Sequence, residues 1–152
     1  MRTLSYRDAT AADLAFIVRL IAEDAVAETP DRADAPDHPR YLAALAAIEA
    51  DPNQRLVVAE YEGKPAGTLQ LTFIPGIARL GEMRCIIEAV HIAPDLRSRG
   101  LGSQMIRWAI EEARARGCGL VQLTSNKKRI DAHRFYQRLG FAQSHEGFKY
   151  SL

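Results

Sequence analysis

Two arginines and two glycines stand close together in the chain, in a segment whose composition suits phosphate binding. The segment consists of Arg97, Ser98, Arg99, Gly100, Leu101, Gly102 and Ser103. It follows an apolar run and Pro94, and it leads directly into a helical pattern. Glycine lets the backbone approach a ligand closely, and the first turn of a helix presents free N–H groups with partial positive charge. We therefore expect residues 97–103 to bind phosphate groups, although the same pattern also suits an ordinary strand-to-helix connection.

One carboxylate, Glu88, lies inside the apolar run before this segment. Residues 86–93 are rich in β-branched side chains, which predicts a central strand that is apolar on both faces. An amine needs roughly 4.6 kcal/mol to lose its proton at pH 7, and a carboxylate of ordinary pKa is a weak base. Glu88 is therefore expected to orient an ammonium group or a water chain, or to form a salt bridge. Strict alternation would place it on the face of Val90 and Ile92, whereas a β-bulge would change that face.

The remaining pattern predicts an α+β fold with a mixed sheet and helices on both sides. Strands are expected at residues 4–7, 55–61, 66–74, 80–93 and 120–124, with a closing strand pair at 141–145 and 148–152. Helices are expected at 11–29, 40–50, 101–116 and 131–139, the first capped by Thr10 together with Asp13. A polar, proline-containing loop is expected at 31–39.

Length and composition predict a single domain over residues 1–152 of a cytoplasmic protein. The net charge is +1, and no basic face carries interleaved aromatic residues, so neither nucleic acid nor an anionic membrane is an expected partner. No apolar run approaches the roughly 18 residues of a membrane span, and the first residues do not resemble a signal peptide. Cys85 and Cys118 are distant and lack C-x-x-C spacing, which indicates reduced thiols, and no residues show metal-ligand spacing.

Taken together, two motifs resemble those of the GCN5-related N-acetyltransferases (GNAT). They are R-x-x-G-x-G at residues 97–102 and A-x-x-F-Y-x-x-L-G-F at residues 132–141. The dinucleotide-binding fingerprint does not fit, because Met105 stands where its third glycine belongs. The resemblance implies a largely antiparallel sheet in which strands 84–93 and 119–125 splay apart. It also implies acetyl-CoA as the acyl donor, with the pantothenate arm bonded to the backbone of Val90, His91 and Ile92.

The resemblance further assigns chemical roles near the C-terminus. Tyr136 would be the general acid that protonates the leaving thiolate, while Phe135 packs in the core. Family members often carry an asparagine seven residues before this tyrosine, where it bonds the cofactor arm. Here Arg129 holds that position and Asn126 lies ten residues before it. The basic residues 127–129 would form a solvated turn, or would meet the 3′-phosphate or an anionic substrate.

From Thr124 onward the chain is most similar to the aminoalkylphosphonate N-acetyltransferase branch of this family. The expected function is acetyl transfer from acetyl-CoA to a primary amine of a small molecule, by direct attack and without an acyl-enzyme. Acetylation of a protein or peptide is an alternative that uses the same site, and a non-catalytic CoA-binding sensor is another. The sequence does not decide between a monomer and a homodimer.

Overall fold

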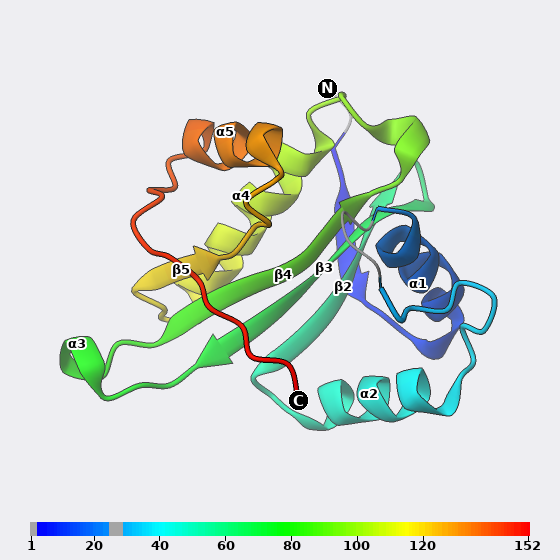
Figure 1. Cartoon of the computed structure of the whole chain (residues 1–152), viewed down its shortest axis with the longest axis horizontal. Coiled ribbons are helices and arrows are strands. Elements are labelled where there is room, and N and C mark those ends of the chain that lie inside the picture. The colour runs from blue at the N-terminus through cyan, green and yellow to red at the C-terminus, as the bar shows by residue number, and fades with distance from the viewer. Residues whose placement is uncertain (1–2, 25–28) are drawn as a thin grey trace.

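The computed structural model describes residues 3–24 and 29–152, and a five-stranded sheet lies at the centre of this part (Figure 1). In chain order the elements are β1 (Ser5–Asp8), the 3-10 turn η1 (Ala11–Asp13), α1 (Leu14–Glu23), α2 (Pro39–Ala50), β2 (Gln54–Tyr61), β3 (Lys64–Ile74), α3 (Ala78–Gly81), β4 (Arg84–Ile92), the 3-10 turn η2 (Pro94–Leu96), α4 (Leu101–Ala115), β5 (Leu120–Leu123) and α5 (Ile130–Arg138). The strand order is β1-β2-β3-β4-β5. Neighbours pair antiparallel except β4 and β5, which are parallel. The predicted α+β fold with a mixed, largely antiparallel sheet is confirmed.

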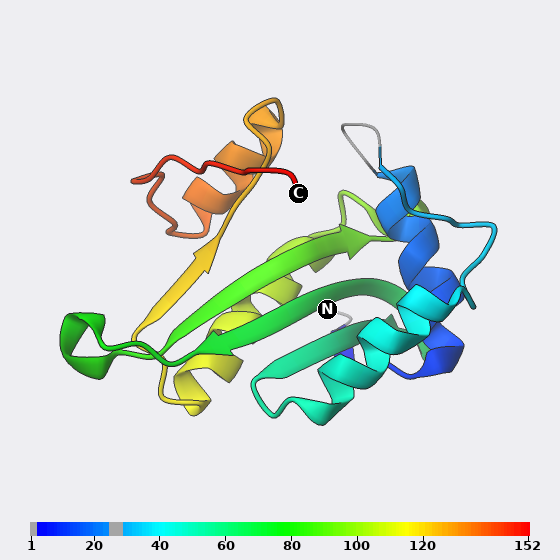
Figure 2. The same ribbon diagram turned by 60° about the horizontal axis from the view of Figure 1, so that its bottom comes forward.

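Helices cover both faces of the sheet, as expected, because successive strand residues point to opposite sides (Figure 2). Val57 and Val58 are neighbours in β2, and both are fully buried. Val57 belongs to the core beneath α4, together with Leu69 and Met105, whereas Val58 packs with Ile17 of α1. The core thus lies in two layers, the larger one between the sheet and α4. The α4 residues in it are Leu101, Met105, Ile106, Ala109 and Ala113.

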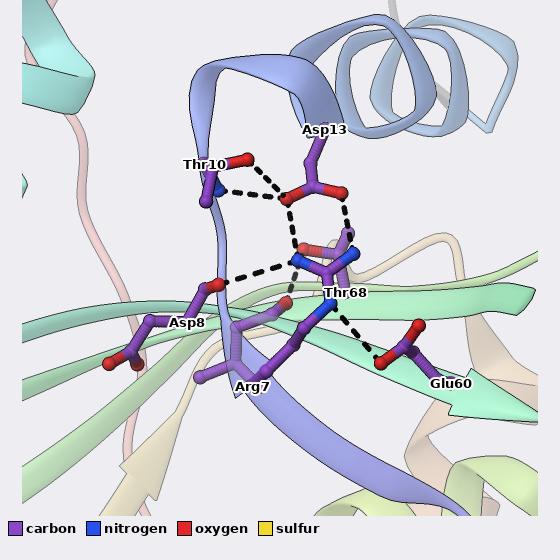
Figure 3. Close-up of polar contacts among 7 residues, drawn as sticks. Arg7, Asp8, Thr10, Asp13, Glu60 and Thr68 are labelled. Atoms are coloured by element: carbon purple, nitrogen blue, oxygen red, sulfur yellow. Dashed lines mark hydrogen bonds and ion pairs between the residues drawn. The ribbon is translucent and has the colours of Figure 1, made fainter. Parts of the chain in front are cut away.

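A partly buried ion pair fixes the start of α1, as Figure 3 shows. The carboxylate of Asp13 accepts hydrogen bonds from both terminal nitrogens of Arg7, at 2.7 and 2.8 Å, and from the N–H of Thr10 at 2.8 Å. Arg7 also donates through Nε to Glu60 at 3.2 Å, so it ties α1 to β2 as well as to β1. The predicted pairing of Thr10 with Asp13 is confirmed. The contacts with Arg7 hold the pKa of Asp13 below its usual value, because they favour the ionised carboxylate.

At Gly67, β3, β4 and α4 lie in close contact. A Cβ atom at this position would lie 2.8 Å from the carbonyl oxygen of His91 and 2.9 Å from Cδ1 of Ile92. It would also lie 2.9 Å from the sulfur of Met105 in α4. Only glycine fits such an approach of backbone, side chain and helix.

Three predicted elements differ from the structure. The third strand of the meander begins at Arg84 rather than at residue 80 or 81, because Arg79 and Leu80 adopt left-handed backbone angles in the short turn α3. Helix α1 ends at Glu23 with Asp24 as its C-cap, and the part of the predicted continuation that covers residues 25–28 lies outside the described residues. The closing strand pair at 141–145 and 148–152 is wrong, because residues 141–152 contain no strand. We refer to residues 142–152 as the C-terminal tail.

Candidate active site

A β-bulge in β4 decides which side chains face the site. Glu88 lies opposite Gln70 of β3, and His91 lies opposite Thr68. The two β4 residues between Glu88 and His91 therefore face the single β3 residue between Thr68 and Gln70. Ala89 takes a positive φ of 51°, which a bulge allows. The face assigned to Glu88 by strict alternation is therefore wrong. Glu88 shares its face with His91 instead of with Val90 and Ile92.

The parallel pair β4–β5 is short, and a pocket lies beyond its end. Pairing runs only from Arg84 opposite Leu120 to Ile87 opposite Leu123, which is the divergence that the GNAT resemblance implied. The pocket has a volume of about 310 Å³. Its walls come from the end of α1, from β4, from the chain after β5 and from α5. They are lined by Ile21, Asp24, Thr29, Ile87, Glu88, Ala89, Val90, His91, Leu123, Thr124, Ser125, Asn126, Arg129, Ala132 and Tyr136.

Asp24 connects three cationic or titratable side chains at one end of the pocket. Its carboxylate lies 3.1 Å from Nδ1 of His91 and 3.6 Å from a terminal nitrogen of each of Arg97 and Arg129. The side chain of His91 is only 11% exposed. Burial lowers the pKa of His91, and the two arginines act in the same direction, although Asp24 opposes them. The imidazole is therefore expected to be neutral at pH 7 and able to accept a proton.

Tyr136 lies across the pocket from β4, on α5. Its ring packs edge-on against Phe135 and Phe141, with centroid distances of 5.1 and 5.8 Å. Burial raises the pKa of Tyr136, and nearby Arg129 only partly offsets this. The phenol thus keeps its proton throughout the neutral range, as a general acid must. Phe135 packs against the main core, so the packing role predicted for it is confirmed.

The segment expected to bind phosphate lies beyond the end of β4, at the start of α4. Gly100, with φ 76°, precedes the first helical residue, and Ser98 also has a positive φ, of 63°. Arg97 donates through Nε to the carbonyl oxygen of Ile92 at 3.2 Å, while Arg99 is exposed. The N–H groups of the first turn of α4 point away from the helix without intrahelical acceptors. Residues 97–103 line no part of the pocket themselves, and Asp24 is the side chain that joins the two regions through Arg97.

Asn126 and Arg129 both line the pocket. The side-chain oxygen of Asn126 accepts a hydrogen bond from the N–H of Lys128 at 2.9 Å, which forms a tight turn. Its carbonyl oxygen lies 2.9 Å from Nε2 of His133. Sequence reasoning missed Asp24, because an acidic residue near the end of a helix carries no signal of its partners.

Other chemistries find little support in the described part of the chain. Cys85 is fully buried, and burial raises its pKa to about 11. The pKa of Cys118 is raised as well, again through burial, so neither thiol is an activated nucleophile. Among residues 3–24 and 29–152, no group of three or more His, Cys, Asp or Glu side chains is placed to hold a metal ion. No helix within these ranges has the length and apolar character needed to cross a bilayer.

Comparison with known proteins decides the family. The model of the acetyltransferase (GNAT) family matches residues 18–141. The chain belongs to this family. Aminoalkylphosphonate N-acetyltransferase of Salmonella typhimurium is 36% identical over 119 residues, covering 76% of this chain and 75% of that protein. The GNAT domain and this relative together identify the chain as an N-acetyltransferase.

Solved structures share the GNAT fold over nearly the whole chain. A crystal structure of a protein described as a transcriptional regulator, from Bacillus halodurans C-125, is 41% identical. It matches with a TM-score of 0.92, over 98% of this chain and 99% of that one. Glucosamine-6-phosphate N-acetyltransferase from Arabidopsis thaliana has a TM-score of 0.76 at 21% identity, covering 97% of this chain and 98% of that one. At that identity the likeness concerns the fold alone.

Proposed function

We propose that this GNAT protein transfers the acetyl group of acetyl-CoA to a primary amine of a small molecule by direct attack. The observation that carries the proposal is the pocket between the diverging strands. Glu88 and His91 lie on its β4 wall and Tyr136 lies on its α5 wall. A proton acceptor and a proton donor thus line one pocket, as acyl transfer to an amine requires.

The backbone supports acetyl-CoA as the donor. Beyond Ile87, β4 has no β5 partner, so the backbone of Val90, His91 and Ile92 offers hydrogen-bonding groups to an extended amide-containing arm. The first turn of α4 offers N–H groups to the pyrophosphate, and Gly100 and Gly102 keep that approach open. Arg97, Arg99 and Ser98 would complete this phosphate site, with Leu101 and Ser103 contributing N–H groups. Asn126 would bond the arm from the opposite side of the gap.

The pocket residues divide the proton transfers between them. Glu88 would hold the incoming ammonium group, or a water molecule that receives its proton, while neutral His91 provides a second acceptor on the same face. The amine nitrogen then forms a bond to the thioester carbonyl carbon, and the carbon–sulfur bond breaks. Tyr136 would give its proton to the departing sulfur. Because both thiols have raised pKa values, no cysteine is expected to carry the acetyl group.

The charges in the pocket favour a small, polar acceptor. Asp24 and Glu88 supply negative charge, and Arg129 supplies positive charge, within a space of about 310 Å³. The name of the Salmonella relative describes amines that also carry a phosphonate group. An acceptor of this kind would place its ammonium group near the carboxylates and its anionic group near Arg129. The two free thiols, Cys85 and Cys118, and the proposed use of acetyl-CoA support a cytoplasmic location.

A panel of acceptors tests the proposal. Thiol release from acetyl-CoA would be followed with aminoalkylphosphonates, with simple alkylamines and with peptides bearing a lysine or a free N-terminus. We expect turnover with small amines, fastest for those with an anionic group. Faster turnover of peptides would favour a protein acetyltransferase. Acetyl-CoA binding by calorimetry without turnover on any amine would instead favour a CoA-binding sensor, the alternative to which the description of the Bacillus relative draws attention.

A further inference from the structure

Asp24 brings together side chains from separate segments of the chain beside the pocket. It caps the end of α1, whereas His91 lies in β4, Arg97 follows β4 and Arg129 precedes α5. Its two carboxylate oxygens have different neighbours. Oδ1 lies 3.6 Å from a terminal nitrogen of Arg97. Oδ2 lies 3.1 Å from Nδ1 of His91 and 3.6 Å from a terminal nitrogen of Arg129. The carboxylate is thus held between two guanidinium groups, and it forms a hydrogen bond with the imidazole.

This hydrogen bond decides which ring nitrogen of His91 is free. A carboxylate can only accept hydrogen bonds, so the Nδ1 that faces Asp24 carries a hydrogen. In a neutral imidazole the other nitrogen, Nε2, is then unprotonated and can accept a proton. Nε2 has no hydrogen-bond partner among residues 3–24 and 29–152, and His91 lines the pocket. Nε2 is therefore the ring nitrogen that can serve an amine bound there.

We propose that Asp24 is a positioning residue, which holds His91 in the Nδ1–H tautomer so that Nε2 takes the proton of the acceptor amine. This rests on the proposed function, because it concerns the amine that the pocket would hold. A proton passes from the ammonium group to Nε2, and the nitrogen lone pair that this frees attacks the thioester carbonyl carbon. The carboxylate of Asp24 stabilises the imidazolium until its proton is released to solvent. The second proton, which the nitrogen loses on amide formation, replaces the one that Tyr136 gives to the sulfur.

Asp24 and Glu88 then have different tasks, although both carboxylates line the pocket. Glu88 is exposed and has no ion-pair or hydrogen-bond partner among the described residues, so it is available to hold an ammonium group. The side chain of Asp24 is 24% exposed, and its oxygens already face an imidazole and two guanidinium groups. Loss of Asp24 should therefore affect turnover more than the affinity for the amine.

The charges around the imidazole set the direction in which its pKa should move. The charged or titratable side chains near it or in the pocket are Asp24, Glu88, Arg97, Arg129 and Tyr136. Burial and the two arginines lower the pKa of His91, whereas Asp24 raises it. Removal of the negative charge of Asp24 should therefore lower this pKa further. A weaker base takes a proton from an ammonium group less readily, so the reaction should slow even where His91 is fully neutral.

Nitrogen NMR on the ¹⁵N-labelled full chain tests the tautomer without any need for turnover. The shifts of the ring nitrogens distinguish the two neutral tautomers from the imidazolium, and the spectrum of His91→Gln assigns the signals among the four histidines. We expect the Nδ1–H tautomer in wild type. In Asp24→Asn the signals should shift toward the Nε2–H tautomer, because an amide can donate to Nδ1, and the pKa of His91 should fall. Glu23→Gln is the matched control: it removes one negative charge at the neighbouring, exposed position and should change neither quantity.

A double-mutant cycle on the best amine tests whether Asp24 acts through His91. Asp24→Asn should lower kcat by about 100-fold, the lower end of the range for a general base because Glu88 remains, and it should change KM little. In the His91→Gln background the same substitution should have little further effect, because the group on which it acts is gone. Asp24→Glu keeps the carboxylate and should recover part of kcat together with the Nδ1–H tautomer, whereas Glu23→Gln should keep the kcat of wild type.

Three results would overturn the proposal. The first is the Nε2–H tautomer in wild type, a measurement that needs no variant to fold. The second is an equal loss of kcat from Asp24→Asn with and without His91, because Asp24 would then act by another route. The third is a raised KM with unchanged kcat, which would mean that Asp24 binds the amine directly. Absence of turnover on every amine would instead overturn the proposed function, while the NMR spectra would still decide whether Asp24 positions His91.

Discussion

Replacing Tyr136 by phenylalanine separates catalysis from packing. The ring contacts with Phe135 and Phe141 remain in Tyr136→Phe, and the hydroxyl has no hydrogen-bond partner among the described residues. The expected loss of unfolding free energy is therefore about 0.5 kcal/mol or less. If the hydroxyl protonates the thiolate, kcat should fall by roughly 10-fold or more, which corresponds to about 1.4 kcal/mol of transition-state stabilisation. The binding of acetyl-CoA should change little, because the interaction forms chiefly in the transition state.

A pH–rate profile on the best amine provides the measurement. Burial raises the pKa of Tyr136 from its ordinary value, so the wild-type phenol stays protonated between pH 7 and 9, and the ratio of the two rates should be constant there. Tyr6→Phe is the matched control. Burial raises the pKa of Tyr6 to about 12, and its ring stacks on Trp108 at 4.2 Å, away from the pocket. Superimposable profiles of wild type and Tyr136→Phe, or an equal rate loss in Tyr6→Phe, would refute the catalytic assignment.

Three further predictions concern the cofactor site, the cysteines and the fold. Gly102→Val should weaken acetyl-CoA binding strongly in calorimetry while the protein stays folded. Gly102→Ala should fold equally well, because its Cβ would lie 3.4 Å from the ring of Phe135, which is an ordinary contact. Cys85→Ser and Cys118→Ser should keep most of their kcat, and ping-pong kinetics or an acetylated cysteine in mass spectrometry would contradict this. Asp13→Asn should lower the unfolding free energy by about 1–2 kcal/mol at pH 7 in urea titrations. Because the pKa of Asp13 is lowered on folding, this difference should persist above pH 3.8 and disappear as the pH falls through the lowered value; a gap that is constant down to pH 2 would argue against the ion pair.

The sequence predicted those parts of the fold in which local pattern and tertiary contacts agree. The helical period after Gly100 gives α4, and the apolar runs expected at 55–61 and 66–74 give β2 and β3, because these elements bury side chains in the core. The closing strand pair failed for a physical reason. Residues 148–152 alternate as a strand does, but a strand needs a partner, and in the described part of the chain these residues pair with no other strand.

The candidate site was predicted in its motifs but not in its contacts. Residues 97–103 and Tyr136 belong to spacings that can be read in the sequence, whereas Asp24 joins His91, Arg97 and Arg129 only through the fold. The face of Glu88 depended on a single bulge, and a bulge at Ala89 has no reliable sequence signal because alanine fits a regular strand equally well.

The close packing around Gly67 helps to fix the distance between β4 and the first turn of α4 in the candidate site. With no room even for a methyl group, β3, β4 and α4 are packed tightly against one another at this point. Met105 lies about one helical turn after the start of α4, so this packing helps to set the distance between the first turn of that helix and β4. A donor that bonds to both places has to match that separation. The enzyme should therefore discriminate acyl donors by the length of the arm between thioester and pyrophosphate, and a truncated acetyl-pantetheine should occupy the pocket without engaging α4.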